Sequence, residues 1–142
     1  MTGKLAVLIS AIIFSFMACG LYAARPAQST AGGSYSDAQV MSGESLYATQ
    51  CAACHGVDLT GVPDLFPALI GDMFIESWQE RSVGDLFQSV LVTMPALDPG
   101  SLTPEQSADV IAYLLNTSGY PSGTDDLTTD QDVLNAIPIG TP

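Results

Sequence analysis

The residues with the most evident chemistry lie together near the middle of the chain, in the segment Cys51-Ala52-Ala53-Cys54-His55. Two thiols three positions apart on one helical turn can add to the two vinyl groups of a haem. The adjacent histidine is then aimed at the iron. Spacing and residue types together predict one haem c, covalently attached through two thioethers, with His55 as an iron ligand.

Three other kinds of site use similar residues. A structural zinc ion needs four ligands, whereas the segment offers two cysteines and the chain's single histidine, which is adjacent to Cys54. A thioredoxin-like dithiol belongs in a βαβ setting, which the hydrophobic periodicity does not indicate. A plain disulfide explains the cysteines but not His55. Haem attachment is therefore the favoured interpretation.

The second axial ligand cannot be another imidazole, because the chain has one histidine. A methionine thioether is then the expected donor. Met41 is too near His55 in sequence to cross the haem plane easily, and Met73 is a fallback. Met94 precedes Pro95, which pushes its backbone out of the α region at the end of an apolar helix face. We predict Met94, the alternative being a methionine that only fills the core.

The first helix that must position these residues is predicted from a capping pattern. Ser36 reads as its N-cap, with Gln39 as the glutamine of a capping box. The helix should run straight into Cys51, with Gly43 and Tyr47 near one face for close packing.

Two further amphipathic helices are predicted. One follows a cap formed by Ser82 and Asp85 and should end by Thr93; the other starts after Thr103 and stops before Gly119. Their apolar faces contain Val83, Leu86, Phe87, Val90, Leu91 and Met94 in the first, and Ala108, Ile111, Ala112 and Leu115 in the second.

The remaining segments indicate the fold class. Residues 56–71 show neither helical nor strand periodicity, which is unusual in a small domain unless they wrap a bulky cofactor. A short helix is predicted at 130–136, and no segment alternates with period two for long enough to form a convincing strand. The expected fold is all-α and rich in loops.

The motifs CAACHG, FPALIG, TMP and VIAYLL together resemble class I c-type cytochromes over about residues 36–119. The resemblance implies a small cytochrome c fold of three to five helices around one covalently bound haem. It also implies that Pro67 offers its carbonyl to the other nitrogen of His55, which orients the imidazole. First and last helices cross in this family, and Gly43, Tyr47 and Tyr113 are the residues suited to that contact.

The run from Gly71 to Pro121 is also similar to cytochrome modules that accompany bacterial quinoprotein dehydrogenases. This similarity implies a one-electron carrier, not an enzyme, that accepts electrons from a dehydrogenase and passes them towards the respiratory chain through an oxidase or another cytochrome. By analogy Trp78 and Arg81 contact the haem propionates; alternatively Trp78 is a core aromatic and Arg81 flanks the Ser82 cap.

Two other functions stay open. One is a gas-binding sensor or catalytic haem protein with a labile sixth ligand, although no distal histidine, arginine or tyrosine is placed for peroxidase work. The other is a dedicated subunit fixed to one enzyme complex through the acidic stretch 125–142.

The N-terminus predicts export. Lys4 precedes an apolar run that ends in small residues, which is the layout of a secretory signal. The 20 residues from Leu5 to Ala24 are also just long enough for an uncleaved membrane anchor. Cys19 lies in an imperfect lipoprotein box, where it is either lipidated or discarded with the signal. The expected location is the bacterial periplasm, either soluble or tethered to the inner membrane.

Charge and composition complete the organisation. After residue 24, two basic residues face 15 acidic ones, so the formal charge is 2 − 15 = −13. This balance disfavours nucleic acid and favours docking to a basic protein surface, the alternative being an acidic surface that only keeps an exported protein soluble. Any membrane contact is expected through the N-terminal segment alone. The predicted parts are a signal or anchor (1–24), a flexible linker (25–35), a cytochrome domain (36–120) and an acidic tail with a short helix (121–142).

Overall fold

The computed structural model describes residues 29–142, which form helices joined by loops. Within that range no β-strand forms, and the only sheet-like contacts are two isolated bridges, Val62 with Phe66 and Ser82 with Pro138. The signal or anchor predicted for 1–24, the lipidation site at Cys19 and the start of the linker lie outside the described residues. No helix within 29–142 has the length and apolar character needed to cross a bilayer.

The all-α class predicted from the sequence is confirmed. In chain order the elements of the described range are η1 (Thr30–Gly32), α2 (Asp37–Gln50), α3 (Ala52–His55), α4 (Gly71–Trp78), α5 (Val83–Thr93), α6 (Pro104–Thr117) and α7 (Gln131–Asn135). Six of these are α-helices, one more than the upper end of the expected range, because the single turns α3 and α7 both count.

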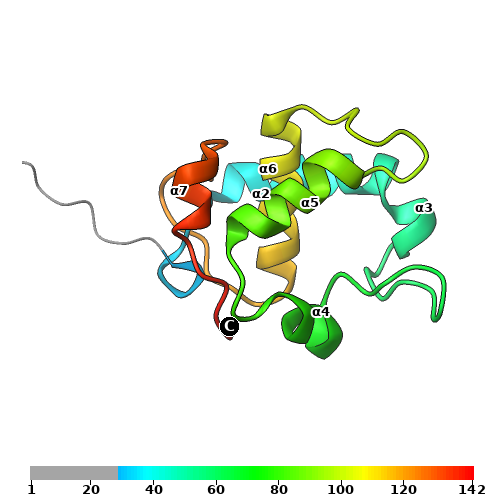
Figure 1. Ribbon diagram of the computed structural model, residues 1–142, viewed down its shortest axis with the longest axis horizontal. Helices are drawn as coiled ribbons and strands as arrows, with labels where there is room; N and C mark the ends of the chain where they lie inside the picture. Colours follow the sequence, from blue (N-terminus) through cyan, green and yellow to red (C-terminus); the bar gives the residue numbers. More distant parts are fainter. Residues whose placement is uncertain (1–28) are drawn as a thin grey trace, which may run out of the picture.

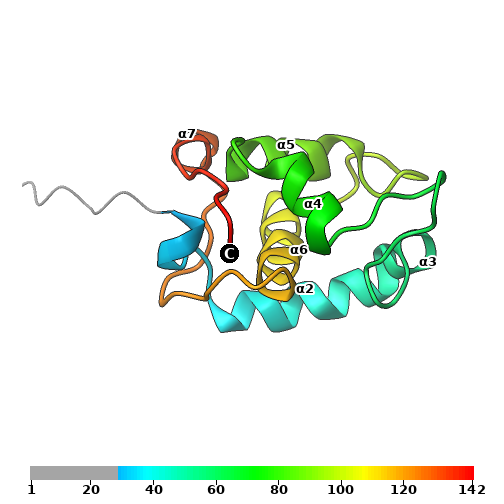
Figure 2. The same ribbon diagram turned by 90° about the horizontal axis from the view of Figure 1, so that it is seen from below.

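Helix α6 lies between α2 and α5, as Figure 2 shows. It is accordingly buried on both sides, and its buried residues are Ser107, Ala108, Val110, Ile111, Ala112, Leu114 and Leu115. The crossing of α2 over α6 is close because Gly43 has no side chain: a Cβ there would overlap the carbonyl oxygen of Asp109 and come within 2.9 Å of the Tyr113 Cβ. Beside it the rings of Tyr47 and Tyr113 pack with centroids 5.4 Å apart.

Complete capping boxes form at two of the three predicted helix starts. Ser82 with Asp85 and Thr103 with Gln106 exchange both hydrogen bonds at the starts of α5 and α6. At α2 the Ser36 side chain caps the helix, but the predicted box is wrong in its second half. The Gln39 amide instead forms two hydrogen bonds with the backbone of Leu127. A distant segment therefore competes successfully for that side chain.

Residues 121–142, set apart above as an acidic tail, pack back onto the helices. Leu127, Leu134, Ile137 and Ile139 are each at most 3% exposed, and α7 packs against α5 (Figure 1). The backbone of 137–139 makes three hydrogen bonds to residues 80–83, at the junction of α4 and α5. Deleting this segment would uncover the core. If a truncated protein failed to bind an enzyme complex, the cause could therefore be unfolding and not the loss of a docking site in residues 125–142.

We predict that Gly43→Ala destabilises the protein. Alanine favours helix over glycine by about 1 kcal/mol, but its methyl group would overlap the Asp109 carbonyl and force α2 and α6 apart. Overpacking of this kind typically costs about 1–3 kcal/mol. Chemical denaturation followed by circular dichroism should show a lower midpoint. Gly140→Ala is the matched control, because a Cβ at Gly140 meets nothing within 4 Å; equal stability of both variants would contradict the close crossing.

Candidate haem-binding site

The two candidate attachment cysteines lie on one helical turn. Cys51 ends α2 and caps α3, and its carbonyl accepts hydrogen bonds from the amides of Cys54 (3.1 Å) and His55 (3.0 Å). Both thiols are partly buried and are not joined in a disulfide. The turn therefore brings Cys51, Cys54 and His55 together, which is the arrangement that attachment to a haem requires.

The loop that follows His55 holds its imidazole ring through a hydrogen bond. His55 is 7% exposed, and its Nδ1 lies 2.9 Å from the carbonyl oxygen of Pro67. A carbonyl oxygen only accepts, so Nδ1 carries the proton and the lone pair of Nε2 is available to a metal ion. This is the contact that the resemblance implied for Pro67.

The loop reaches His55 through a glycine that the sequence analysis did not single out. Gly61 donates its amide to the carbonyl of His55 (2.9 Å) and has a φ of +70°. A Cβ there would overlap the Phe66 carbonyl oxygen and lie 2.7 Å from the carbonyl carbon of Pro67. A glycine in an aperiodic segment was the only available signal, and it does not reveal which backbone comes close.

Tyr47 also has a role beyond the packing that was expected. Its hydroxyl donates to the carbonyl oxygen of Gly56 at 2.6 Å, which ties α2 to the residue directly after His55. The side chain is 2% exposed. Burial, with smaller contributions from Cys51, Tyr113 and Asp58, raises the pKa of Tyr47 to about 12. A protonated hydroxyl is thus maintained as a donor throughout the neutral range.

The three candidate methionines differ in environment. Met41 on α2 and Met73 on α4 are 66% and 68% exposed. Met94 is partly buried, packs against the core and ends α5 in an extended conformation (φ −116°, ψ 153°). The backbone of Met94, before Pro95, therefore leaves the α region as the sequence predicted, whereas its role as an iron ligand stays a prediction.

Trp78 and Arg81 lie next to each other at the end of α4. The Arg81 guanidinium carbon lies 4.5 Å from the centroid of the Trp78 ring, and a guanidinium nitrogen is 4.0 Å from a carboxylate oxygen of Asp85. Trp78 packs partly buried against the core, while Arg81 is exposed. Both the propionate interpretation and the structural one fit this placement.

The residues present fit a haem c better than the alternatives. Partly buried apolar side chains from α3, α4, α5 and the loop before α4 border the core: Ala52, Leu69, Ile70, Trp78, Leu91 and Met94. Burial raises the pKa of the Cys51 thiol, whereas a thioredoxin-like nucleophile requires a lowered one. Within residues 29–142 no three His, Cys, Asp or Glu side chains gather in a way that could hold a metal ion by themselves.

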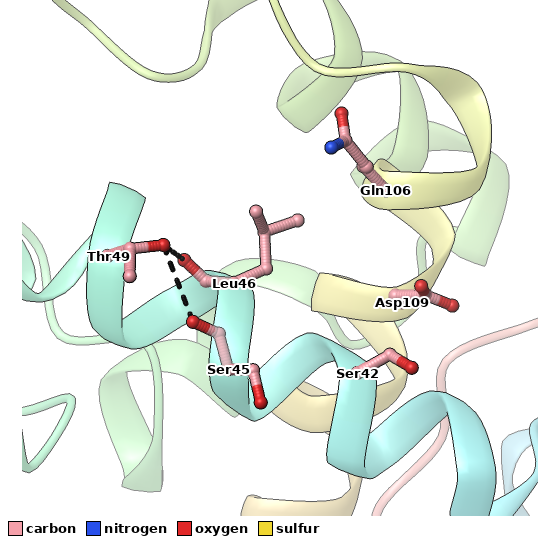
Figure 3. Close-up of a pocket in the computed structure, with 6 residues that line it drawn as sticks. All are labelled: Ser42, Ser45, Leu46, Thr49, Gln106 and Asp109. Atoms are coloured by element: carbon pink, nitrogen blue, oxygen red, sulfur yellow. Dashed lines mark hydrogen bonds between the residues drawn. The ribbon is translucent and has the colours of Figure 1, made fainter.

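A hollow on the other side of α2 does not form part of this site. It has a volume of about 360 Å³ and lies between α2 and α6 (Figure 3), where it is lined by Ser42, Ser45, Leu46, Thr49, Gln106 and Asp109. The Thr49 hydroxyl donates to the carbonyls of Ser45 and Leu46 within its own helix. No predicted haem-binding residue lines the hollow.

Comparison with known proteins agrees with the fold and the motif. Residues 38–114 match the family model described as cytochrome c oxidase, cbb3-type, subunit III. The chain is 31% identical over 102 residues to the cbb3-type cytochrome c oxidase subunit CcoP of Rubrivivax gelatinosus, covering 70% of this chain and 32% of that protein. It is 50% identical over 36 residues to the cytochrome bc1 complex cytochrome c subunit of Mycobacterium tuberculosis, covering 25% of this chain and 13% of that protein.

Among solved structures, a chain of the sulfane dehydrogenase SoxCD from Paracoccus pantotrophus has a similar fold. The TM-score is 0.50 at 21% identity, covering 70% of this chain and 52% of that one. The chain spans about a third of the length of CcoP and a smaller part of the mycobacterial subunit.

We predict a Tyr47-dependent loss of stability in alkali. The folded-state pKa of about 12 lies above the ordinary value of 10.0, so the folded state binds this proton more tightly. The stabilisation is complete below pH 10 and is lost as the pH rises from about 10 to about 12. In this window the free energy of unfolding should fall less steeply for Tyr47→Phe than for the unaltered protein. Identical pH slopes in denaturant titrations would contradict the role given to the hydroxyl.

Proposed function

Because the chain belongs to the c-type cytochrome family described as cytochrome c oxidase, cbb3-type, subunit III, we propose that it is a one-electron carrier with a single haem c. The resemblance to class I c-type cytochromes drawn from the sequence is confirmed. Covalent attachment at Cys51 and Cys54 and axial ligation by His55 and Met94 are the proposed details. When bound, the haem supplies a centre that accepts and releases one electron.

The observation that carries the proposal is the hydrogen bond from His55 Nδ1 to the carbonyl of Pro67 at 2.9 Å. It fixes the tautomer and the orientation of the imidazole, and it increases the basicity of Nε2 towards a metal ion. Gly61 and Tyr47 support it by donating hydrogen bonds to two consecutive backbone carbonyls, those of His55 and Gly56. These are the constraints expected around a permanent ligand.

Met94 is the proposed second ligand because of its position and its burial. It is the least exposed of the three candidate methionines, and its backbone leaves the helix at that residue. A thioether donor raises the reduction potential relative to a second imidazole, and a filled sixth position leaves no site for a substrate. Electron transfer without bond chemistry on a substrate then follows.

The proposed setting is the bacterial periplasm, with export through the N-terminal segment and with tethering by that segment or by a lipid on Cys19. The proposed donor and acceptor are other redox proteins, a proposal supported by the names of the matched family and relatives, which are subunits of an oxidase and of the cytochrome bc1 complex. A dehydrogenase, including a quinoprotein dehydrogenase, is the proposed donor, and an oxidase or another cytochrome the acceptor. The excess of acidic residues disfavours nucleic acid as a partner.

We predict that Met94→Ala opens the iron to external ligands. The unaltered holoprotein should give a low-spin c-type visible spectrum that carbon monoxide does not change. Met94→Ala should retain the haem, lose the low-spin features and bind carbon monoxide in the reduced state. Met73→Ala is the matched control, because Met73 is 68% exposed, and it should behave like the unaltered protein.

The same spectra decide between the functions. If the unaltered reduced protein binds carbon monoxide readily, the sixth position is labile, and a gas sensor or catalytic haem protein replaces the carrier as the better function. If Met94→Ala leaves the spectrum unchanged, Met94 is not the ligand.

A further inference from the structure

Three large apolar side chains are more than 70% exposed on the loops next to the candidate ligands. Val57 lies two residues after the end of α3, Leu65 lies in the loop that leads to Pro67, and Leu97 lies three residues after Met94. Their exposed fractions are 86%, 73% and 96%. Exposed apolar side chains are ordinary when scattered but indicate a contact site when they gather on one surface.

The fold does gather these loops. Both views place α3, the loop 56–70 and the loop 94–103 at one end of the molecule, whereas α7 lies at the other end (Figures 1 and 2). This is also the end that carries Cys51, Cys54 and His55. A partner that contacts these loops therefore approaches the proposed redox centre and not the C-terminal segment.

Each of the three side chains has an exposed aspartate as its neighbour in the chain. The pairs are Val57 with Asp58, Leu65 with Asp64, and Leu97 with Asp98. The Asp58 carboxylate is oriented by the hydroxyl and the amide of Thr60, at 2.9 and 3.3 Å. Each exposed apolar side chain on these loops thus has an anionic group beside it in the chain.

No positive charge of the described residues balances these aspartates. Arg81 is the single lysine or arginine within 29–142, against 15 acidic residues. It lies at the junction of α4 and α5, where it is engaged with Trp78 and Asp85. The potential around the loops 56–70 and 94–103 is consequently negative.

We propose that Val57, Leu65 and Leu97, rimmed by Asp58, Asp64 and Asp98, form the docking surface for a redox protein with an apolar patch inside a ring of lysines or arginines. The six residues are called the acid-rimmed end below. The inference rests on the proposed electron-carrier function and adds the chemistry of its partner. Charge complementarity favours a basic partner. The aspartates would repel an acidic partner surface and would not attract a neutral one.

The two components of the surface have different tasks. The aspartates act over a distance comparable to the Debye length, about 10 Å at 0.1 M salt, and so accelerate encounter. The apolar side chains act only on contact, where their removal from water holds the complex together. A small interface of this kind releases its partner quickly, which repeated electron exchange requires.

The experiment uses the holoprotein and a lysine-rich cytochrome c as the probe. The second-order rate constant of electron exchange is measured by stopped flow at low and high ionic strength. The triple variant Asp58→Asn/Asp64→Asn/Asp98→Asn is compared with Glu80→Gln/Asp125→Asn/Asp132→Asn. Both variants lose three negative charges, but the second set lies outside the loops 56–70 and 94–103.

At low ionic strength the first variant should react about tenfold more slowly than the unaltered protein, within the range known for electrostatic steering. The second variant should change the rate less than about twofold, and high salt should abolish the difference. Equal slowing by both variants would show that the net charge of the protein, and not the acid-rimmed end, determines the rate of electron exchange. No slowing by either would remove the docking role of the aspartates.

A further variant tests the apolar component. Val57→Ser/Leu97→Ser should slow the exchange at high ionic strength as well, with an unchanged visible spectrum and unchanged thermal stability, because both side chains are exposed. An unaltered rate would exclude an apolar centre. Reduction by dithionite distinguishes failure of the proposed function from failure of the docking surface. If the protein has no reducible haem, both the electron-carrier function and the docking surface are overturned. If the haem is reducible but none of these variants changes the exchange rate, only the docking surface is overturned.

Discussion

The close crossing of α2 over α6 is the constraint on which the rest of the structure depends. Gly43 lets the two helices approach until the backbone of α6 occupies the space of a side chain, and the Tyr47–Tyr113 pair fixes the angle beside it. Because α2 runs directly into Cys51, this contact also places the thiols and His55. The site is thus positioned by helix packing, and the loop 56–70 adds hydrogen bonds to His55.

The C-terminal segment performs a related task at the other side of α5. Its backbone bonds to 80–83 and the burial of Leu134, Ile137 and Ile139 hold the junction of α4 and α5, and with it the start of the helix that ends at Met94. Each of the two candidate iron ligands therefore belongs to an element held by a distant part of the chain. The segment 121–142 can be acidic and still pack onto the helices, because most of its large apolar side chains are buried and its carboxylates are exposed to water.

Local signals made much of the fold predictable. N-caps and apolar faces depend on neighbours within a few positions, and the bounds of α2, α5 and α6 followed from them. Contacts between distant segments did not follow. Gln39 bonds to a residue 88 positions away instead of closing its capping box, and the irregular spacing of Leu127, Leu134, Ile137 and Ile139 gave no periodic sign of burial. At the candidate site, Cys51, Cys54, His55 and Met94 were predicted from residue type and spacing. Gly61 and the Tyr47 hydroxyl could not be predicted, because both act on backbone groups that only folding brings near.

The most direct test of the central claim, covalent attachment of one haem at Cys51 and Cys54, is the mass of the denatured, exported protein and of its proteolytic peptides. The account predicts a chain heavier by one haem, with the added mass on the peptide that contains Cys51 to His55 and lost when both cysteines are replaced by alanine. A denatured chain with the mass of the polypeptide alone, or haem mass on any other peptide, would contradict it.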